Sequence, residues 1–313
     1  MKDIRLLSAS SETSDSIGLV GLGLMGSALA ERFLNSGFNV IGFDTNPTRR
    51  KVLRKLGGQS LGSVSEIAMA CKRIVFSLPT TDVVESVIRE LGAKLRAGTT
   101  IIDTTTGEPE QTAALGAKLA KRSVRYLDAT VVGSSAQTRM GEVIVLVGGS
   151  TRTFAGCRDI FGSFAECVFH MGACGSGARM KLVVNLVLGL NRAVLAEGLA
   201  FARAVGVLPE RALEILRAGT AYSRVMDTKG AKMLNDDFAA QAKLSQHLKD
   251  VRLILSLGKQ TGAKLPLSKL HRKMLEGLED MGYGELDNSA IIKHFRQSSK
   301  SQAPSSSEAP NSN

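Results

Sequence analysis

Two patterns of apolar and polar positions divide the chain. In the first half, short apolar runs alternate with stretches of helical periodicity. Such alternation is typical of buried strands in a parallel sheet that are connected by crossover helices. The runs that we expect to form strands are residues 16–20, 38–43, 73–79, 99–103, 124–129 and 142–149. This half therefore predicts an open α/β sheet.

The second half has helical periodicity throughout and no evident strand. A helical pattern extends from Gly177 to Ala204, which is long enough for one helix that connects two domains. Gly206 is expected to end this helix, and Pro209 to start the next one. Further helical patterns cover residues 209–218, 222–234, 239–262 and 266–281, with a last one near 286–296. The second half therefore predicts an all-α domain.

A glycine-rich turn follows the first predicted strand directly and opens a helical pattern. Its six residues are Gly21, Leu22, Gly23, Leu24, Met25 and Gly26. After a strand and before a helix, the three glycines favour a tight turn, close approach of a pyrophosphate to the backbone, and close helix–strand packing. The helix N-terminus adds free N–H groups and a positive dipole end. We therefore expect a Rossmann domain with NAD or NADP at these residues.

Asp44 is expected to select between the two cofactors. It ends the second predicted strand, about 20 residues after the glycines, where a carboxylate bonds the ribose hydroxyls of NAD. A carboxylate there would repel the additional phosphate of NADP. A basic cluster over residues 49–55 could host that phosphate, or could simply be a solvated helix face. We expect NAD, with NADP as the alternative.

Polar and small residues follow several of the predicted strands. These are the loop after Leu78 and Pro79, the turn at residues 104–109, and residues 133–136, where Gly133 and Ser134 begin a possible anion-binding nest. In open α/β sheets ligands bind beyond the carboxyl ends of the strands. These loops are therefore candidates for contact with cofactor or substrate, although a hydroxyl-rich turn is also a common helix cap.

Lys181 and Asn185 lie four residues apart at the start of the long helix, so that they share one of its faces. The residues around them are largely apolar, and buried lysines are rare. The pair is either a lysine that extends to water beside a structural asparagine, or a catalytic amine with a positioning amide. Burial would lower the pKa of the amine towards the range that acid/base catalysis needs.

Composition and charge narrow the class of protein. The chain has 313 residues, 43% of them hydrophobic, which is enough for two domains. No apolar run is long enough to span a membrane and the start has no signal-peptide pattern, so we expect a cytoplasmic protein. The net charge of +11 is spread out, and with few aromatic residues it argues against a nucleic-acid surface. Four dispersed cysteines match no metal or disulfide pattern.

These features predict four segments. We expect a flexible N-terminus at residues 1–15, a dinucleotide-binding Rossmann domain at 16–176, an interdomain helix with an all-α C-terminal domain at 177–298, and a disordered tail at 299–313. The tail is serine- and proline-rich and lacks aromatic residues. The four histidines, His170, His247, His271 and His294, are scattered. We expect each to be a surface or capping residue and expect no metal site.

Taken together, these motifs resemble the β-hydroxyacid dehydrogenase family, whose members include 3-hydroxyisobutyrate dehydrogenase and which is related to 6-phosphogluconate dehydrogenase. The resemblance covers about residues 16–298. It rests on the glycine turn at 21–26, Leu78–Pro79, residues 103–109, 128–133 and 141–149, Lys181 with Asn185, and Lys249 with Asp250. It implies an NAD(P)-dependent oxidoreductase whose subunits associate, as a homodimer or homotetramer, through the C-terminal domain.

The resemblance also implies roles for individual residues. Lys181 corresponds to the catalytic acid/base, and Asn185 to a residue that holds the substrate. Leu78, Pro79 and Thr106 correspond to cofactor contacts. Lys249 corresponds to a lysine near the nicotinamide and the substrate.

Two departures from the family pattern concern the substrate. A family serine that would bond the substrate carboxylate is Val132 here, although Ser134 or Ser135 could supply a hydroxyl one or two positions further along. The first of two family asparagines is Val184.

The predicted function is therefore hydride transfer between NAD(P) and a small carboxylate-bearing substrate. The reaction interconverts a 3-hydroxy acid and its semialdehyde or keto form. Two alternatives share the same fold, namely a non-catalytic dinucleotide-binding interaction protein and an imine reductase. The presence of Lys181 disfavours both.

Overall fold

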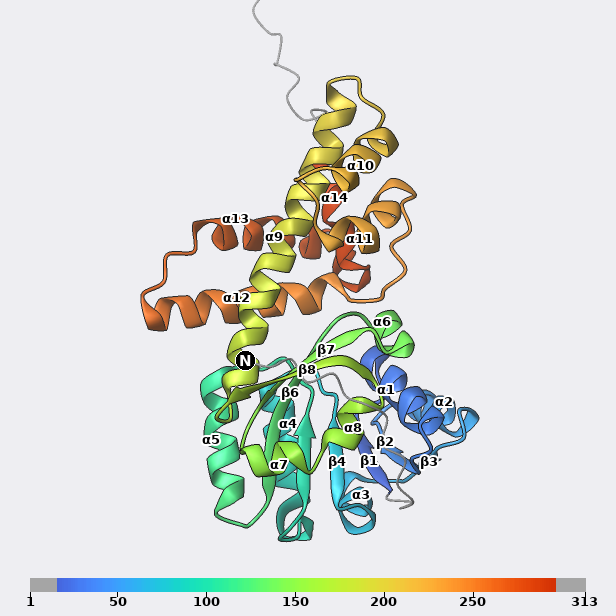
Figure 1. Cartoon of the computed structure of the whole chain (residues 1–313), viewed down its shortest axis with the longest axis vertical. Coiled ribbons are helices and arrows are strands. Elements are labelled where there is room, and N and C mark those ends of the chain that lie inside the picture. Colours follow the sequence, from blue (N-terminus) through green and yellow to red (C-terminus); the bar gives the residue numbers. More distant parts are fainter. Residues whose placement is uncertain (1–15, 297–313) are drawn as a thin grey trace, which may run out of the picture.

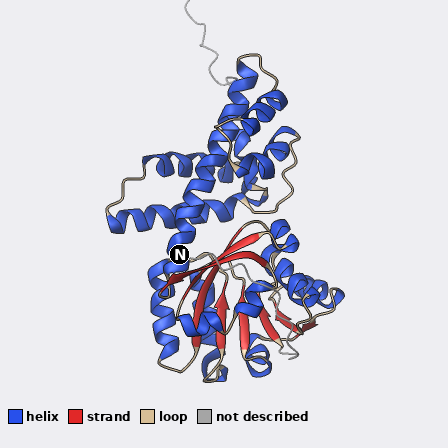
Figure 2. Ribbon diagram, in the orientation of Figure 1, coloured by secondary structure: helices blue, strands red, loops and turns tan. Residues whose placement is uncertain are grey.

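The computed structural model describes residues 16–296. All strands lie in one half of the molecule, and the other half is helical (Figures 1 and 2). The long helix α9 (Ser176–Ala204) leaves the strand-containing half and extends through the helical half. The predicted fold class is thus confirmed. The division into domains at residue 176 stays a prediction, and the expectations for residues 1–15 and 299–313 lie outside the described residues.

One eight-stranded sheet forms the first half, in the order β3-β2-β1-β4-β5-β6-β7-β8. Neighbouring strands are parallel except for the antiparallel pair β6 and β7. The strands are β1 (Ile17–Val20), β2 (Val40–Phe43), β3 (Gln59–Ser60), β4 (Arg73–Phe76), β5 (Thr100–Asp103), β6 (Arg125–Val132), β7 (Val143–Gly148) and β8 (Ala165–Gly172). All six predicted strands are present, together with β3 and β8, which the apolar pattern did not predict. Both are edge strands that are only partly buried, so they carry no continuous apolar run.

Helices cover both faces of the sheet, which is why its central strands are apolar on both sides. These helices are α1 (Leu24–Asn35), α2 (Pro47–Lys55), α3 (Val64–Ala70), α4 (Thr81–Leu91), α5 (Pro109–Ala120), α6 (Ser135–Met140), α7 (Thr151–Ala155) and α8 (Arg158–Gly162). Residues of α1, α7 and α8, such as Phe33 and Phe161, form a core on one face. Residues of α3, α4 and α5, such as Val84 and Leu115, form a core on the other.

A carboxylate from the sheet fixes the start of α9. Asp128 on β6 accepts hydrogen bonds from the backbone N–H groups of Gly175 and Ala178, both at 2.8 Å. Gly177 makes this approach possible, because a Cβ there would lie 2.5 Å from the Leu146 carbonyl oxygen and 2.8 Å from Asp128 Oδ2. The first turn of α9 is therefore held directly against β6 and β7, and this sets the position of Lys181.

By length and composition, α9 could also cross a membrane. However, 44% of its most apolar stretch is buried inside the protein. The helix also carries three buried polar side chains, Lys181, Asn185 and Arg192. These buried side chains pack the helix into the interior of the protein.

The remaining helices pack around the second part of α9. They are α10 (Pro209–Ala218), α11 (Arg224–Leu234), α12 (Leu244–Thr261), α13 (Pro266–Asp280) and α14 (Ile292–Arg296), with 3-10 turns at Tyr283–Glu285 and Asn288–Ile291. Their shared core includes Leu199, Met233, Leu248 and Leu275.

Two predicted helix boundaries in this half are wrong, for one physical reason. The helix expected at 239–262 begins at Leu244, and the helix expected near 286–296 is a 3-10 turn followed by α14. Asp287, fully buried, accepts hydrogen bonds from the backbone N–H groups of Gln241, Ala242 and Ser289 and from the Lys229 ammonium. Because this carboxylate takes up the N–H groups, the segment before α12 is a loop rather than a helix.

Candidate active site

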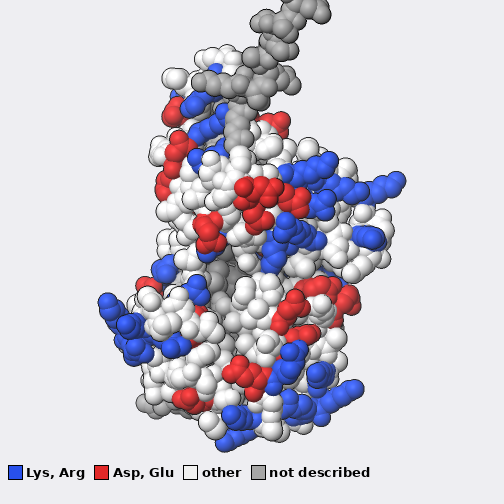
Figure 3. Space-filling view, turned by 180° about the vertical axis from the view of Figure 1, so that it is seen from behind, with Lys and Arg blue, Asp and Glu red and all other residues white. Residues whose placement is uncertain are grey.

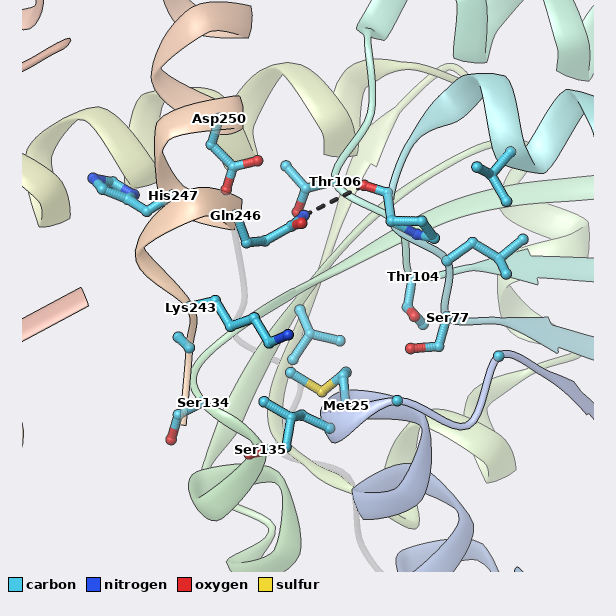
Figure 4. Close-up of a pocket in the computed structure, with 18 of the residues that line it drawn as sticks. Met25, Ser77, Thr104, Thr106, Ser134, Ser135, Lys243, Gln246, His247 and Asp250 are labelled. Carbon is cyan, nitrogen blue, oxygen red and sulfur yellow. Dashed lines mark hydrogen bonds between the residues drawn. The ribbon is translucent and has the colours of Figure 1, made fainter. Parts of the chain in front are cut away.

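A cavity of about 650 Å³ lies between the carboxyl ends of the strands and the helical half. Its walls come from the glycine turn, from the loops after β4, β5 and β6, from one face of α9, and from the beginning of α12 (Figure 4). Predicted site residues that line it are Gly21, Gly23, Leu24, Met25, Asp44, Leu78, Pro79, Thr106, Gly133, Ser134, Lys181 and Asn185. The chain thus brings together residues that are far apart in the sequence.

The glycine turn has the shape that a dinucleotide needs. Gly21 has a φ of +93°, and a Cβ at Gly26 would lie 1.9 Å from the Gly21 carbonyl oxygen, so both positions require glycine. At Gly23, by contrast, an added Cβ would meet only Arg49 Nη1, at 4.0 Å, and would project into the open cavity. No side chain caps the N-terminus of α1. Its N–H groups and the open backbone at Gly23 therefore fit a pyrophosphate.

Leu22 and Gly26 do not line the cavity but support the turn. The Leu22 side chain is buried in the core, and its N–H group donates a 2.7 Å hydrogen bond to Asp44 Oδ2. Gly26 packs against Gly21. These two residues maintain the shape of the turn, while Gly23, Leu24 and Met25 line the cavity.

Asp44 lies at the end of β2, as expected for a ribose-binding carboxylate. Besides Leu22, the N–H group of Asn46 donates to it at 2.8 Å, and the Arg49 guanidinium lies 3.3 Å from Oδ2. Arg49 also lines the cavity, whereas the other members of the basic cluster do not. The Arg49 side chain is 49% exposed, so it is solvated and also within reach of the cavity, and both interpretations stay open for it.

One hydrogen bond joins the two loops that follow β4 and β5, and another holds the second loop to the end of β5. The N–H group of Leu78 donates to Thr105 Oγ1 at 3.2 Å, and that of Thr105 donates to Asp103 Oδ1 at 2.9 Å. Burial raises the pKa of Asp103 to about 6, and the Tyr126 hydroxyl donates to it at 2.5 Å. Ser77 and Thr104 also face the cavity (Figure 4). Thr104 belongs to the turn at residues 104–109 that the sequence made a candidate, whereas Ser77 was not assigned. The position of Ser77, immediately after β4, could have indicated it.

Lys181 and Asn185 project from α9 into the cavity, with 7% and 5% of their surfaces exposed. Asn185 Nδ2 donates a 2.8 Å hydrogen bond to Asp250 Oδ2 on α12. Within residues 16–296 no hydrogen bond or ion pair engages the Lys181 amine. Burial lowers the pKa of Lys181 to about 8; Asp250 opposes this shift, and Lys249 and Arg192 add to it. The amine can therefore gain or lose a proton near neutral pH.

Lys249 connects the two halves of the molecule instead of lining the cavity. Its ammonium donates to the Thr106 carbonyl oxygen at 2.5 Å and to the Pro79 carbonyl oxygen at 3.2 Å, and it forms a 3.0 Å ion pair with Asp250. Gln246 also donates to the Pro79 carbonyl oxygen, at 3.3 Å (Figure 4). Helix α12 thus holds the loops that the family pattern assigns to the cofactor.

The loop after β6 contributes Gly133 and Ser134, but neither Val132 nor Val184 lines the cavity. Successive side chains of a strand point to opposite faces, and it is Val131 that lies in the wall. Ser134 caps α6, because its hydroxyl oxygen accepts a hydrogen bond from the N–H group of Gln137 at 3.2 Å. The hydroxyl hydrogen is still available to a substrate.

Two of the four histidines are not at the surface. His247 and His271 are 6% and 3% exposed, and their ring centroids lie 5.1 Å apart. Gly189 on α9 allows them to pack there, because an added Cβ would lie 2.5 Å from His247 Nε2. The prediction of surface or capping histidines is therefore wrong for these two. In the described part of the chain, no three His, Cys, Asp or Glu side chains form a group that could hold a metal ion.

This geometry is that of a dinucleotide-dependent oxidoreductase, and comparisons with known proteins specify the family. Residues 16–172 match the NAD-binding domain of 6-phosphogluconate dehydrogenase, and residues 175–295 match the NAD-binding domain of NADP-dependent 3-hydroxyisobutyrate dehydrogenase. The chain belongs to the β-hydroxyacid dehydrogenase family and is an NAD(P)-dependent oxidoreductase.

Individual relatives are similar over almost their full length. The chain is 32% identical to 2-(hydroxymethyl)glutarate dehydrogenase of Eubacterium barkeri over 290 residues, which cover 91% of this chain and 96% of that protein. It is 27% identical to 2-hydroxy-3-oxopropionate reductase of Escherichia coli, over 88% and 96% of the two chains. The crystal structure of 3-hydroxyisobutyrate dehydrogenase from Salmonella typhimurium superposes with a TM-score of 0.82 at 25% identity, over 89% of this chain and 99% of that one.

Proposed function

We propose that this protein interconverts a small 3-hydroxy acid and its semialdehyde or keto form, with Lys181 as the acid/base. One observation carries the proposal: an unpaired, buried amine with a pKa of about 8 faces the cavity that the glycine turn also lines. A bound nicotinamide would accept the hydride from the substrate carbon, or supply it.

The residues around Lys181 account for the proton and the orientation. In oxidation the neutral amine removes the proton from the substrate hydroxyl, and in reduction the ammonium returns it. Asn185 is a positioning residue in the substrate pocket: one N–H bonds Asp250, which leaves its other N–H and its carbonyl oxygen for the substrate oxygen. Gly133 and Ser134 lie where a substrate carboxylate would meet a free hydroxyl.

Known relatives support this substrate class. Two of them are named for 2-(hydroxymethyl)glutarate and 2-hydroxy-3-oxopropionate, which both carry a carboxylate and an oxygen-bearing carbon. The test is a panel of 3-hydroxy acids and small semialdehydes, assayed with NADH or NADPH for reduction and with the oxidised forms for oxidation. We expect turnover with at least one of them. If only imines were reduced, or if the protein bound NAD(P)H and turned over nothing, the proposal would be wrong.

We further propose that NAD is preferred over NADP, because Asp44, which three donors fix at the end of β2, would bond the ribose hydroxyls of NAD. Asp44→Asn should lower the ratio of kcat/KM for NADH to that for NADPH by about tenfold or more. The reason is that the 2′-phosphate no longer meets a carboxylate, and Arg49 is released to bind it. Asp280→Asn, an exposed carboxylate change on α13, is the control. An unchanged ratio in Asp44→Asn would show that another residue sets the preference.

The oligomer that we propose uses a stripe of exposed apolar side chains on α9. Val183, Val187, Val194 and Phe201 are 54%, 51%, 67% and 66% exposed, and their spacing places them on one face. Phe201→Glu should convert a dimer or tetramer into a 33.2 kDa monomer in light scattering. Met140→Glu, which changes an exposed side chain on α6, should leave the assembly intact. A wild-type monomer would refute the proposal.

We propose a cytoplasmic location, which the cysteines support: Cys71, Cys157, Cys167 and Cys174 are all free. Cell fractionation tests this location, and recovery from an oxidising compartment would contradict it.

The surface charges agree with an enzyme that acts on small molecules. On the face shown in Figure 3, basic and acidic side chains occur in several separate groups rather than in one continuous basic surface.

A further inference from the structure

Arg192 is a buried cation at the cavity that the mechanism does not use. It lies on α9 in the series Lys181, Asn185, Leu188 and Arg192, whose spacing places all four on one helix face, and all four line the cavity. It is 3% exposed, and its Nε and Nη1 atoms have no hydrogen-bond partner. No carboxylate forms an ion pair with it in the described residues. A buried guanidinium without a counter-anion is costly to the fold.

The carboxylates near Arg192 are already engaged. Asp287 is paired with Lys229 at 2.8 Å and accepts three backbone hydrogen bonds. Asp250 is bound by Asn185 and Lys249. The charge of Asp287 still favours the charged form of Arg192, but within the described residues no carboxylate oxygen bonds its guanidinium directly.

Other polar groups that line the same cavity also lack partners. Within residues 16–296, neither His247 Nε2 nor Asn288 Oδ1 has a hydrogen-bond partner. Buried polar groups are normally hydrogen-bonded. Burial, followed by the charge of Arg192, lowers the pKa of His247, so this ring is neutral and can donate only one hydrogen bond. Arg192, His247 and Asn288 thus form a polar end of the cavity that the chain itself does not satisfy.

The cofactor phosphates are not the partner of this end. They are assigned to the glycine turn and α1, whereas the titratable groups whose pKa values Arg192 affects, or that affect its own, belong to α9 and to the helical half. These are Lys181, Lys229, His247, His271 and Asp287. Arg192 lies seven residues beyond Asn185, or about 10 Å along the helix axis, and its side chain leans back towards Asn185. It can therefore reach the far end of a substrate held at Lys181 and Asn185.

We propose that Arg192 binds a second carboxylate of the substrate, several bonds away from the reacting carbon, and that the preferred substrate is a dicarboxylic hydroxy acid or its semialdehyde. This inference rests on the proposed function of the same cavity. Arg192 acts as a specificity residue, with the neutral His247 ring as a second donor to the same carboxylate.

The test compares one dicarboxylate with one monocarboxylate. In the wild type, kcat/KM for 2-(hydroxymethyl)glutarate should exceed kcat/KM for 3-hydroxyisobutyrate. In Arg192→Met, kcat/KM for 2-(hydroxymethyl)glutarate should fall by about 10- to 100-fold, mainly through a higher KM. Arg192 also helps to lower the pKa of Lys181, so the variants are compared at their own pH optima. There, kcat/KM for 3-hydroxyisobutyrate should stay within about threefold of the wild-type value, because that substrate has no second carboxylate. Arg192→Lys should recover part of the loss.

A phosphorylated hydroxy acid, assayed alongside, should be a poorer substrate than the dicarboxylate. The reverse order would show that the site takes phosphate and would overturn the carboxylate assignment.

Binding to the wild type provides a test that does not depend on the variant or on turnover. Glutarate should raise the melting temperature of the wild type in the presence of NADH more than butyrate does at the same concentration. Equal effects of the two acids would overturn the proposal, as would an equal loss of activity on both substrates in Arg192→Met. Absence of turnover with every hydroxy acid, while glutarate still binds selectively, would instead refute the proposed function and leave the anion site standing.

Discussion

Lys181→Met is expected to lower turnover by about 10²–10⁴-fold, the range that a positioned acid or base contributes. The methionine fills similar space but cannot exchange a proton. Binding of NADH should stay within about twofold, because the glycine turn and Asp44 do not contact Lys181. Rapid-mixing measurement of hydride transfer, with NADH titrated by fluorescence, checks both expectations.

Lys181→Arg is the matched control, because it keeps the positive charge but cannot release a proton near neutral pH. It should be as inactive as Lys181→Met if proton transfer is the role, and substantially active if charge alone matters. Turnover of Lys181→Met within about tenfold of the wild type would contradict the assignment.

Lys181→Met is also expected to change how the stability of the protein depends on pH. The folded pKa of Lys181, about 8, is below the value of about 10.4 for an unfolded lysine. Between these values the unfolded state binds more protons, so the free energy of unfolding of the wild type should contain a component that rises with pH from about 8 to about 10.4. Lys181→Met should lack this component and should unfold at the same or a higher temperature than the wild type at pH 7.

Gly26→Ala is expected to weaken NADH binding by about tenfold or more while the helical half stays folded. An alanine Cβ would lie 1.9 Å from the Gly21 carbonyl oxygen, so the turn or α1 must move away from the position that holds the pyrophosphate. Isothermal titration calorimetry with NADH measures the loss.

Gly277→Ala is the control for this experiment. It makes the same chemical change at a glycine in α13 around which an added Cβ meets no atom within 4 Å. It should leave NADH affinity unchanged and slightly raise stability, because alanine is the better helix former. If Gly26→Ala bound NADH as tightly as Gly277→Ala does, the glycine turn would not be the phosphate site.

The sheet and the long helix could be predicted because their signals are local. The apolar strands, the glycine spacing and the position of Asp44 each lie within short stretches of the chain. Helix α9 was expected from Gly177 to Ala204 and begins one residue earlier, at Ser176. The edge strand β8 was missed because it is only partly buried and so carries no apolar run.

The other wall of the cavity could not be predicted, because it depends on contacts between distant residues. Asp287 shapes the loop before α12 through bonds that span more than 40 positions of the sequence. Asp250 meets Asn185 across 65 positions. The spacing along α9 places Arg192 on the same helix face as Lys181, but no local pattern shows that His247 from α12 is buried at the same cavity.

The structure also changes where specificity is expected. The sequence directed attention to Val132 and Val184, the two departures from the family pattern. Neither lines the cavity, whereas Arg192 and the loop at residues 241–243 do. We therefore expect substrate specificity to depend on the α9 and α12 side of the cavity.

The pH dependence of hydride transfer, measured in both directions, tests the central claim that Lys181 exchanges the proton. Oxidation requires the neutral amine, so its rate should rise with pH and level off above an apparent pKa near 8. Reduction requires the ammonium, so its rate should fall through the same pKa. Both transitions should be absent from the residual activity of Lys181→Met. Wild-type rates without a transition near pH 8, or the same transitions in the variant, would contradict the claim.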